Sequence, residues 1–381
     1  MRVLLVSHAC AAPINRAKLS ALSRRPDLEI SLLVPRLWKE GGCRYLTKPG
    51  EDEGFRIYAG GVLFSGRVTG HFYRSGLNRA LRAERPDIVH LEEEPWSLVA
   101  AQIMAELALI RPRPKLVLFS FENMDLNLPW YRDGIERWVL ASADALIAGG
   151  ETVRERLLGR GAAPGRLTVL PQFGLDPDIF RPPTGPERPD IFTVGFIGRH
   201  VHEKGVDILI EALARLKGAW RAIIAGDGPT RAELESSAGR HGMGGRILFT
   251  GWLDHFEIPG LLRQMHVLVL PTRTVERYKE QFGHVLIEAM SAGVVPVGSS
   301  SGEIPHVIGA DGFIFPENDP AALAGILQDL LDRPALLDRL SASGRKRVIS
   351  EFGWDVIAEK THAVYGRALS GENAGCGAQG Q

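Results

Sequence analysis

The sequence has few of the residues that staple small folds or cross membranes. Its three cysteines, Cys10, Cys43 and Cys376, have the spacing of neither a disulfide framework nor a metal site, and their odd number suits a reducing compartment. No apolar run approaches the roughly 20 residues of a membrane span, and the run that follows Arg2 is too short for a signal peptide. We therefore expect a cytoplasmic protein.

An excess of charge of one sign is also absent. The chain has 45 Lys and Arg against 45 Asp and Glu, which argues against nucleic acid as a partner. Residues 1–82 nevertheless carry 14 basic against six acidic side chains. Two interpretations are open: a solvated basic face, or a surface that meets phosphate groups of an acceptor or, as a peripheral contact, an anionic membrane. The candidates for such a surface are Arg16, Lys18, Arg36, Lys39 and Arg67.

Short apolar runs alternate with amphipathic helical patterns along all 381 residues, a length that suits two domains. Strands are predicted at 2–7, 28–35, 87–91, 115–121, 143–148, 167–170, 192–197, 220–225, 246–250, 266–270 and 294–297. Runs such as VLLV and LVLF are typical of parallel strands buried on both faces. The rhythm predicts an α/β fold of two doubly wound, Rossmann-like domains, with the active site in the cleft between them.

The domain boundaries follow from proline content. Residues 171–190 hold six prolines, so a linker is predicted at 176–190 between domains at 1–175 and 191–353. An amphipathic helix is predicted at 354–369 and is expected to pack back on the first domain. The tail at 370–381 is expected to be disordered.

The second domain opens with a strand, a loop and a helix, in FTVGFIGRHVHEKGVDILIEAL. Gly198 leaves the strand, and Arg199 and Lys204 flank a loop that enters a helix at Gly205. Two cations beside free helix N–H groups could hold a diphosphate, although a surface Arg and Lys on such a loop is the alternative. The following GDGP, 226–229, permits a tight turn and close approach of a ligand. The dinucleotide fingerprint GxGxxG appears nowhere, which argues against a dehydrogenase.

The segment 271–293, PTRTVERYKEQFGHVLIEAMSAG, carries two carboxylates eight residues apart, Glu280 and Glu288. Gly283 can start a helix and direct its unpaired N–H groups at an anion. Glu288 lies on an otherwise apolar stripe, where an unpaired carboxylate is costly, so it needs hydroxyl partners. The alternative is a structural partner, an arginine or a backbone N–H.

This spacing, in EQFG and EAMSAG followed by PVGSSSGEIPHVI, resembles the E-x7-E signature of family 4 retaining glycosyltransferases of the GT-B fold. GR…EKG, GxGP, FTGWL, VLPQFGLDPDIF and FGWDVIAEK strengthen the resemblance, which covers nearly the whole chain and is densest in the second domain. It implies sugar transfer from a nucleotide-sugar donor, with acceptor binding by the first domain and donor binding by the second.

The resemblance also implies roles for single residues. Arg199 and Lys204 would hold the donor diphosphate, Glu288 would accept the ribose hydroxyls, and Glu280 would lie beside the donor sugar. The other expected donor contacts are Gly198, Leu253 near the base, the backbone amides of Phe282, Gly283 and His284, and Val285.

The first domain departs from the family pattern. The loop HACAAPINR lacks the glycine pair that the family often has after its first strand. In LFSFENMD, Glu122 falls where the family often has a histidine near the reacting carbon. We predict that Glu122 contacts donor sugar or acceptor as a catalytic residue, with structural capping as the alternative. The acids of HLEEEPW are either acceptor surface or merely solvated.

No metal or cofactor is expected. Asp176-Pro-Asp178 spells the DxD of metal-dependent transferases but lies in the predicted linker, so we interpret it as structural. Cations and amides aimed at the leaving diphosphate would supply most of the catalysis. The family resemblance implies front-face transfer, in which the leaving phosphate helps to deprotonate the acceptor.

Two other functions are open: a sugar-nucleotide 2-epimerase of the same fold, and a non-catalytic nucleotide-sugar binding protein, against which the full set Arg199, Lys204, Glu280 and Glu288 argues. The expected setting is biosynthesis of a polysaccharide, glycolipid or glycoconjugate. Carbohydrate, lipid-linked and small-molecule acceptors are open, as are the donor base and sugar.

Overall fold

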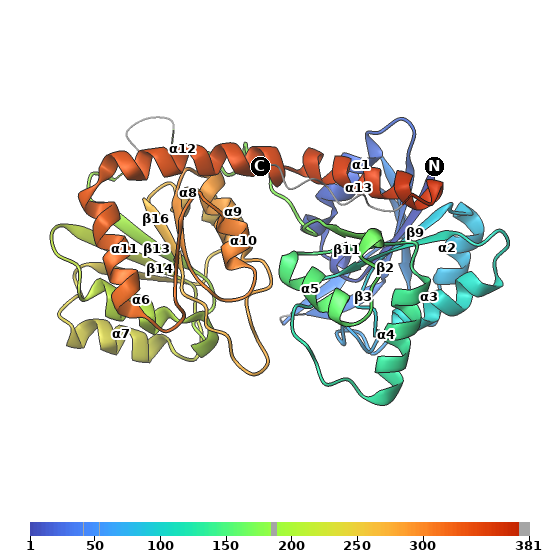
Figure 1. The fold of residues 1–381 in the computed structure, drawn as a ribbon, viewed down its shortest axis with the longest axis horizontal. Helices are drawn as coiled ribbons and strands as arrows, with labels where there is room; N and C mark the ends of the chain where they lie inside the picture. The colour runs from blue at the N-terminus through green and yellow to red at the C-terminus, as the bar shows by residue number, and fades with distance from the viewer. Residues whose placement is uncertain (41, 53, 184–188, 373–381) are drawn as a thin grey trace. The chain divides into compact units, whose positions relative to one another are not determined.

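The computed structural model describes residues 1–40, 42–52, 54–183 and 189–372 and divides the chain into two compact units. Unit 1 comprises Met1–Gly174 and Trp354–Gln381, and unit 2 comprises Leu175–Gly353 (Figure 1). Part of the predicted linker, 184–188, and the tail from 373 lie outside the described residues.

Unit 1 is built on one large sheet with the strand order β12-β11-β10-β9-β1-β2-β6-β5, parallel except for the pair β5 and β6. Its strands are β1 Arg2–Ser7, β2 Glu29–Pro35, β5 Gly50–Asp52, β6 Phe55–Gly60, β9 Ile88–Glu92, β10 Lys115–Ser120, β11 Ala145–Ala148 and β12 Leu167–Val169. Two hairpins lie outside it, β3 Leu37–Glu40 with β4 Cys43–Leu46, and β7 Val62–Leu63 with β8 Phe72–Tyr73.

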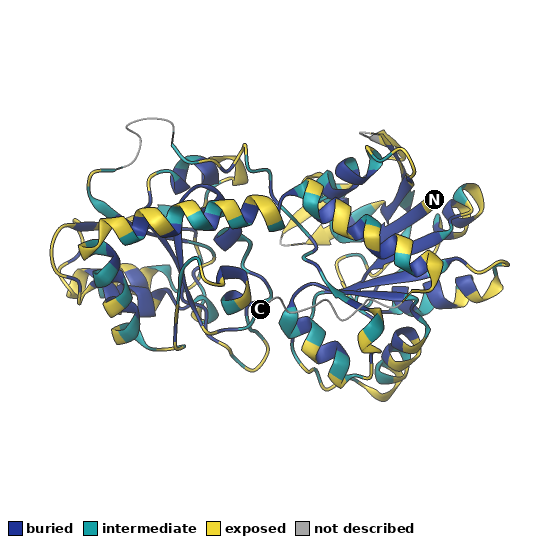
Figure 2. Cartoon of the chain, turned by 45° about the horizontal axis from the view of Figure 1, so that its top comes forward, coloured by how far each residue is buried: buried dark blue, intermediate teal, exposed yellow. Residues whose placement is uncertain are grey.

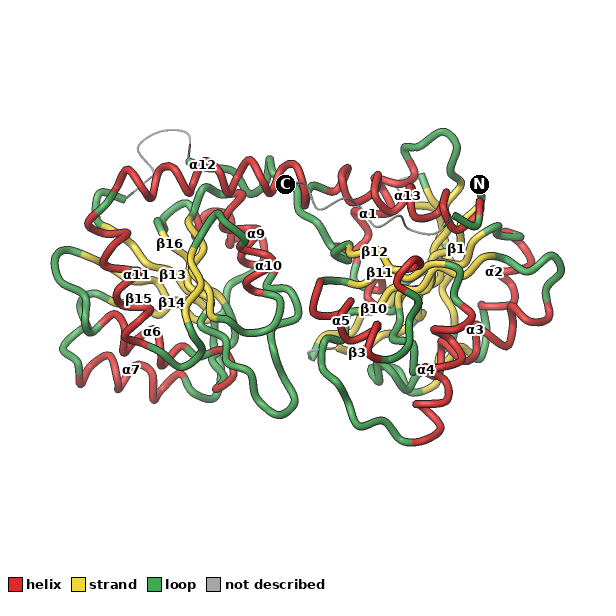
Figure 3. Tube along the Cα trace, viewed as in Figure 1, coloured by secondary structure: helices red, strands yellow, loops and turns green. Residues whose placement is uncertain are grey.

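Helices cover both faces of this sheet (Figure 3). They are α1 Ala17–Ser23, α2 Leu77–Glu84, α3 Leu98–Leu109, α4 Trp130–Ser142, α5 Glu151–Gly159 and α13 Trp354–Ser370, with 3-10 turns η1 Ala9–Ala11, η2 Pro13–Arg16 and η3 Pro164–Arg166. Leu4 of β1 packs in the core that α2 and α3 cover, whereas Leu5 packs in the core that α1 and α13 cover. This division confirms that the strands are buried on both faces.

Unit 2 contains a parallel sheet with the order β15-β14-β13-β16-β17-β18. Its strands are β13 Phe192–Ile197, β14 Trp220–Ala225, β15 Ile247–Gly251, β16 Val267–Leu270, β17 Val295–Ser299 and β18 Phe313–Phe315. Its helices are α6 Val206–Leu213, α7 Arg231–Arg240, α8 Ile258–Leu262, α9 His284–Ser291, α10 Ile304–Ile308, α11 Pro320–Asp332 and α12 Pro334–Glu351, with 3-10 turns η4 His202–Lys204 and η5 His255–Glu257. In Figure 2 the strands are dark blue and many helices have one blue and one yellow side, the pattern of helices that cover a core.

The predicted doubly wound α/β class is therefore confirmed. Each predicted strand corresponds to an observed one, within two residues at either end. Strands β5, β6 and β18 and the two hairpins were not predicted. Of the helices in the described residues, none has the length and apolar character that crossing a membrane requires.

Among the parallel strands, chain order reverses once in each sheet, between β13 and β16 in unit 2 and between β1 and β9 in unit 1. In doubly wound sheets ligands bind beyond the carboxyl ends of the strands at such a reversal. The loops after these four strands are therefore the expected ligand-binding loops.

Candidate active site

In unit 2 the loops after β13 and β16 are packed against each other. Gly205 ends the first loop with φ +66°, and a Cβ there would lie 2.0 Å from the carbonyl oxygen of Pro271, which follows β16. Only glycine combines this left-handed backbone with so close an approach. The packing brings Lys204, just before Gly205, beside the segment that carries Glu280.

Glu280 is buried, and one of its oxygens, Oε2, gathers three donors. It accepts from Lys204 Nζ at 2.6 Å, from Thr272 Oγ1 at 2.8 Å and from the Tyr278 hydroxyl at 3.1 Å. The same Tyr278 oxygen accepts from Lys204 Nζ at 2.6 Å. Burial first, and Glu280 second, raise the pKa of Tyr278, so the phenol stays a donor. The two predicted residues thus form one ion pair, and Thr272 and Tyr278 are partners that the sequence did not reveal.

Arg199 lies in a different environment from Lys204. Its side chain is 60% exposed, and Glu203 Oε1 is 3.9 Å from its guanidinium. The Lys204 side chain is only 15% exposed. Arg199 therefore keeps most of its donors for a ligand, whereas Lys204 already shares its charge with Glu280.

Glu288 lies on α9, whose start is set by Gly283. Gly283 is the N-cap, with φ +78°, and leaves the first N–H groups of the helix uncapped by a side chain. Within the described part of the chain, the Glu288 carboxylate makes no hydrogen bond or ion pair, and burial raises its pKa to about 7. The described residues therefore do not provide the arginine or backbone N–H that the structural alternative for Glu288 requires. A carboxylate of this kind is costly unless a ligand pairs with it.

The other predicted donor contacts surround these groups. Phe282 is buried and its ring centroid lies 4.8 Å from that of His284, whose pKa burial lowers to about 4. Val285 occupies the first turn of α9, half-buried. Leu253 follows β15, which lies two strands from β13 in the sheet.

The GDGP turn has a role within the chain. A Cβ on Gly226 would lie 1.9 Å from the carbonyl oxygen of Gly198, and one on Gly228 would lie 2.3 Å from that of His200. These glycines therefore allow the loop after β14 to pack on the loop after β13. The close approach that the structure shows is to the backbone of the loop after β13.

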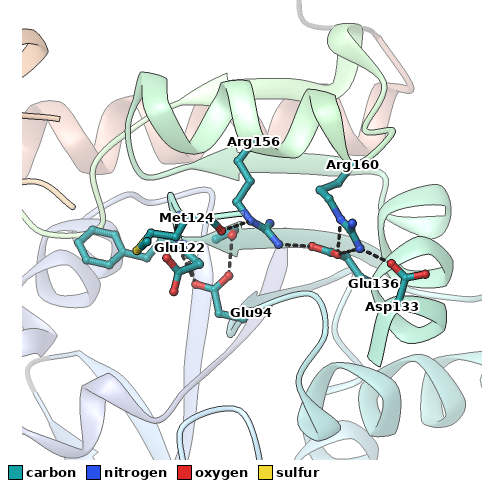
Figure 4. A network of polar contacts seen from close by, with 9 residues as sticks. Glu94, Glu122, Met124, Asp133, Glu136, Arg156 and Arg160 are labelled. Atoms are coloured by element: carbon teal, nitrogen blue, oxygen red, sulfur yellow. Dashed lines mark hydrogen bonds and ion pairs between the residues drawn. The ribbon is translucent and has the colours of Figure 1, made fainter. Parts of the chain in front are cut away.

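In unit 1, Glu122 caps its own loop. Its Oε1 accepts from the Met124 N–H at 2.9 Å, and its own N–H donates to Glu94 at 3.0 Å (Figure 4). Glu94 also accepts from Ser120 Oγ at 2.6 Å and from the Phe121 N–H at 2.8 Å. Burial raises the pKa of Glu94 to about 7. These contacts favour the capping alternative for Glu122, and its catalytic role stays a prediction.

The acids of HLEEEPW are not solvated, so that one of the two alternatives is wrong. Glu92 and Glu93 are buried, and Glu94 is half-buried. Glu92 pairs with Lys18 of α1, which is itself buried. Lys18 therefore does not belong to the basic surface for which it was a candidate, because its charge is neutralised inside unit 1.

A second buried network fixes the helices beside this loop. Arg156 donates to Glu136 and to the Met124 carbonyl oxygen, both at 2.8 Å, and Arg160 donates to Glu136 at 2.7 Å (Figure 4). Its members pair with one another and with the backbone, which is a structural arrangement.

Among residues 1–40, 42–52, 54–183 and 189–372, no group of three His, Cys, Asp or Glu side chains is placed to hold a metal ion. Asp176 of the DxD accepts from the Asp178 N–H at 2.9 Å, a local turn contact. That contact agrees with the structural interpretation of these aspartates.

Comparisons with known proteins match both units. Residues 181–347 match the family "Glycosyl transferases group 1", and residues 18–172 match the "Glycosyl transferase 4-like domain". The chain is 31% identical to a glycogen synthase of Mycobacterium tuberculosis over 311 residues, covering 76% of this chain and 71% of the relative. It is 28% identical to the 2-deoxystreptamine glucosyltransferase of Streptomyces kanamyceticus over 311 residues, covering 74% and 78%.

Solved structures agree on the fold. The sucrose-phosphate synthase of Thermosynechococcus elongatus superposes with a TM-score of 0.74 at 19% identity, covering 97% of this chain and 99% of that one. Anabaena Alr3699/HepE, solved with UDP, gives 0.70 at 16% identity, covering 96% and 100%. The chain therefore belongs to the glycosyl transferases of group 1, and its fold is GT-B.

Proposed function

We propose that the protein is a retaining, metal-independent glycosyltransferase that moves a sugar from a nucleotide-sugar donor to an acceptor hydroxyl. One observation carries the proposal: Glu288 is half-buried and makes no hydrogen bond or ion pair among the described residues. It lies on α9 of unit 2, which also holds Arg199 and the Lys204–Glu280 pair. A ligand with hydroxyls and a diphosphate matches these groups, and a nucleotide sugar has both.

The proposed division of labour follows from exposure. Arg199 and the uncapped N–H groups of α9 would meet the diphosphate, whose charge grows as its bond to the anomeric carbon breaks. Lys204 would be oriented by Glu280 and Tyr278 toward the same charge. Glu288 would accept the ribose hydroxyls, which would remove the cost of its burial. Relatives solved with UDP and UDP-glucose support this class of donor.

The acceptor is proposed only by class. The relatives include a glycogen synthase, a 2-deoxystreptamine glucosyltransferase and a phosphatidylinositol N-acetylglucosaminyltransferase subunit. Their names cover carbohydrate, small-molecule and lipid-linked acceptors. We propose a cytoplasmic role in making a polysaccharide, glycolipid or glycoconjugate.

Incubation with UDP-, GDP- and ADP-glucose, without added acceptor, tests the proposal. A transferase should release nucleoside diphosphate and glucose from one of them, with water as a slow acceptor. A 2-epimerase would instead give sugar inverted at carbon 2. A non-catalytic binding protein would bind the nucleotide sugar, as measured by calorimetry, without converting it.

A further inference from the structure

A cavity of about 830 Å³ lies in unit 1, at the edge of the sheet where the parallel strands begin. Arg2 and Lys115, the first residues of β1 and β10, line it, and so does Asp87, directly before β9. The expected ligand-binding loops of unit 1 follow the opposite, carboxyl ends of β1 and β9. The cavity is therefore separate from these loops, and it has the volume of a small-molecule site.

The lining of this cavity is strongly basic. The described lining residues include one acid, Asp87, and six cations: Arg2, Arg82, Arg85, Arg111, Arg113 and Lys115. A second carboxylate, Asp144, pairs with Arg113 and Lys115 from outside the lining. Four positive charges remain after these two acids are counted. The ends of α2, α3 and α13 lie at the cavity and contribute about half a negative charge each, which still leaves roughly two to three positive charges.

Contacts within the chain hold three of these cations in place. Arg113 Nη2 and Lys115 Nζ donate to the two oxygens of Asp144, at 2.9 and 3.0 Å. Arg111 Nη1 donates to two carbonyl oxygens at the end of α3, at 2.7 and 2.8 Å. A guanidinium has several N–H donors in one plane, and these contacts occupy only some of them. The two arginines are therefore oriented by the chain and keep donors for a ligand.

Arg85 is held in a backbone conformation that favours glycine. It caps the C-terminus of α2 with φ +42° and ψ +58°, in the left-handed region. A Cβ is strained there, so glycine is the residue most often found in this conformation at a helix end. Neither its side chain nor that of Arg82, in the last turn of α2, makes a hydrogen bond or ion pair in the part of the chain that the structure describes. The strained position therefore presents a guanidinium whose partner would be a ligand.

Apolar side chains complete the lining. Leu81, Ile110 and Leu369 come from the ends of α2, α3 and α13, and three prolines also line the cavity. None of the described lining residues is aromatic, whereas surfaces that dip into a membrane are rich in Trp, Tyr or Phe. Cations beside apolar walls in a concave site fit a soluble organic phosphate, because its phosphate group can meet the cations while its carbon skeleton meets the walls.

We propose that this cavity is a second ligand site, which binds a small organic phosphate of about two to three negative charges. The positive charge left in the lining sets this number, and one phosphate monoester carries about two charges at neutral pH. The guanidinium groups of Arg82 and Arg85 would pair with the phosphate oxygens. The site lies outside the donor groups of unit 2 and does not depend on sugar transfer.

The test measures binding of phenyl phosphate by ligand-observed proton NMR at pH 8, where this probe carries about two negative charges. Phenyl sulfate, of nearly the same shape but with a single charge, is the ligand control. Arg82→Ala and Arg85→Gly each remove one cation from the cavity. The matched control is Arg79→Ala, which removes one exposed cation of α2 outside the cavity. Arg199→Ala controls for binding of the probe at the donor groups of unit 2.

Phenyl phosphate should bind several-fold more tightly than phenyl sulfate. Arg82→Ala and Arg85→Gly should each weaken phenyl phosphate binding by roughly tenfold or more, the scale of one hydrogen bond between charged groups. Arg79→Ala and Arg199→Ala should stay within about twofold of wild type, because salt screens distant exposed charges. Arg85→Gly should keep a melting temperature near that of wild type, since glycine removes the backbone strain.

Equal binding of phenyl phosphate by wild type, Arg82→Ala and Arg85→Gly would overturn the proposal, as would no binding by wild type. A loss of binding confined to Arg199→Ala would also overturn it, since the probe would then occupy the donor groups. Vesicles of phosphatidylcholine and phosphatidylglycerol test a membrane as the alternative ligand. If Arg82→Ala and Arg85→Gly weaken vesicle binding but not phenyl phosphate binding, the cavity is a membrane contact and the proposal is wrong. If Arg85→Gly does not fold, Arg82→Ala decides alone.

Discussion

Replacing Glu288 by glutamine should weaken nucleotide binding and, at the same time, stabilise the ligand-free protein at alkaline pH. The carboxyl has a folded-state pKa of about 7 because of burial, against about 4.5 when exposed in the unfolded chain. A raised carboxyl pKa means that the protonated form suits the fold. The stability that it contributes is complete below pH 4.5 and is lost as pH rises toward 7.

The magnitude follows from these two values. Linkage gives a loss of about 0.8 kcal/mol at pH 5 and about 3.3 kcal/mol at pH 8. Glutamine does not titrate, so its advantage over wild type should grow by about 2.5 kcal/mol between the two pH values. Any fixed difference in packing or hydrogen bonding cancels in this comparison. Glu94 also has a pKa of about 7, but it titrates in the same way in both proteins, so its contribution to stability cancels in the comparison.

The assay is urea denaturation of wild type and Glu288→Gln at pH 5 and pH 8, with nucleoside diphosphate affinity by calorimetry. Affinity should fall by roughly 10- to 100-fold, the scale of one hydrogen bond to a charged group. Glu211→Gln, an exposed acid on α6, should change neither quantity. A stability difference that does not grow with pH would refute the burial argument, and unchanged affinity would refute the ribose assignment.

Three further outcomes are expected. Arg199→Ala and Lys204→Ala should each lower kcat by roughly 10²-fold or more, and near-normal kcat in both variants would mean that the diphosphate binds elsewhere. Lys204→Ala should also lower the free energy of unfolding in urea by about 3 kcal/mol, because Glu280 stays buried without its cation. Activity should survive EDTA, whereas loss on chelation with rescue by manganese would reopen Asp176 and Asp178 as ligands. Reversing the charge of the exposed Arg36, Lys39 and Arg67 should raise the KM of a phosphate-bearing acceptor without changing donor affinity. Salt at roughly 0.5 M should raise the acceptor KM of the wild type in the same way. If neither the charge reversal nor the salt changes the acceptor KM, the basic residues form only a solvated face.

Most of the fold could be predicted from the sequence, because many of its strands are continuous apolar runs that end at glycine or polar residues. Helices start directly after Gly205 and Gly283, where they were predicted. Strand β6 was missed because its residues alternate in burial beside charged Arg56, and β18 because three residues carry no periodic signal.

For the candidate site, the sequence suggested residues but not their contacts. Motif spacing pointed to Lys204 and Glu280, but their pairing depends on packing at Gly205 that no local pattern encodes. The burial of the acids after β9 could not be predicted for the same reason. Three acids in a row look solvated, yet Lys18 from another element meets Glu92, and the His8 loop meets Glu93.

The central claim is transfer with retention from a nucleotide sugar, and the anomeric configuration of the first product tests it most directly. Each of the three test donors, UDP-, GDP- and ADP-glucose, carries α-linked glucose, and proton NMR can follow the glucose released to water before it mutarotates. The account predicts that α-glucose forms first and that the signal of the β anomer grows in later. If β-glucose formed first, the reaction would invert the anomeric carbon, and the proposed mechanism would be wrong.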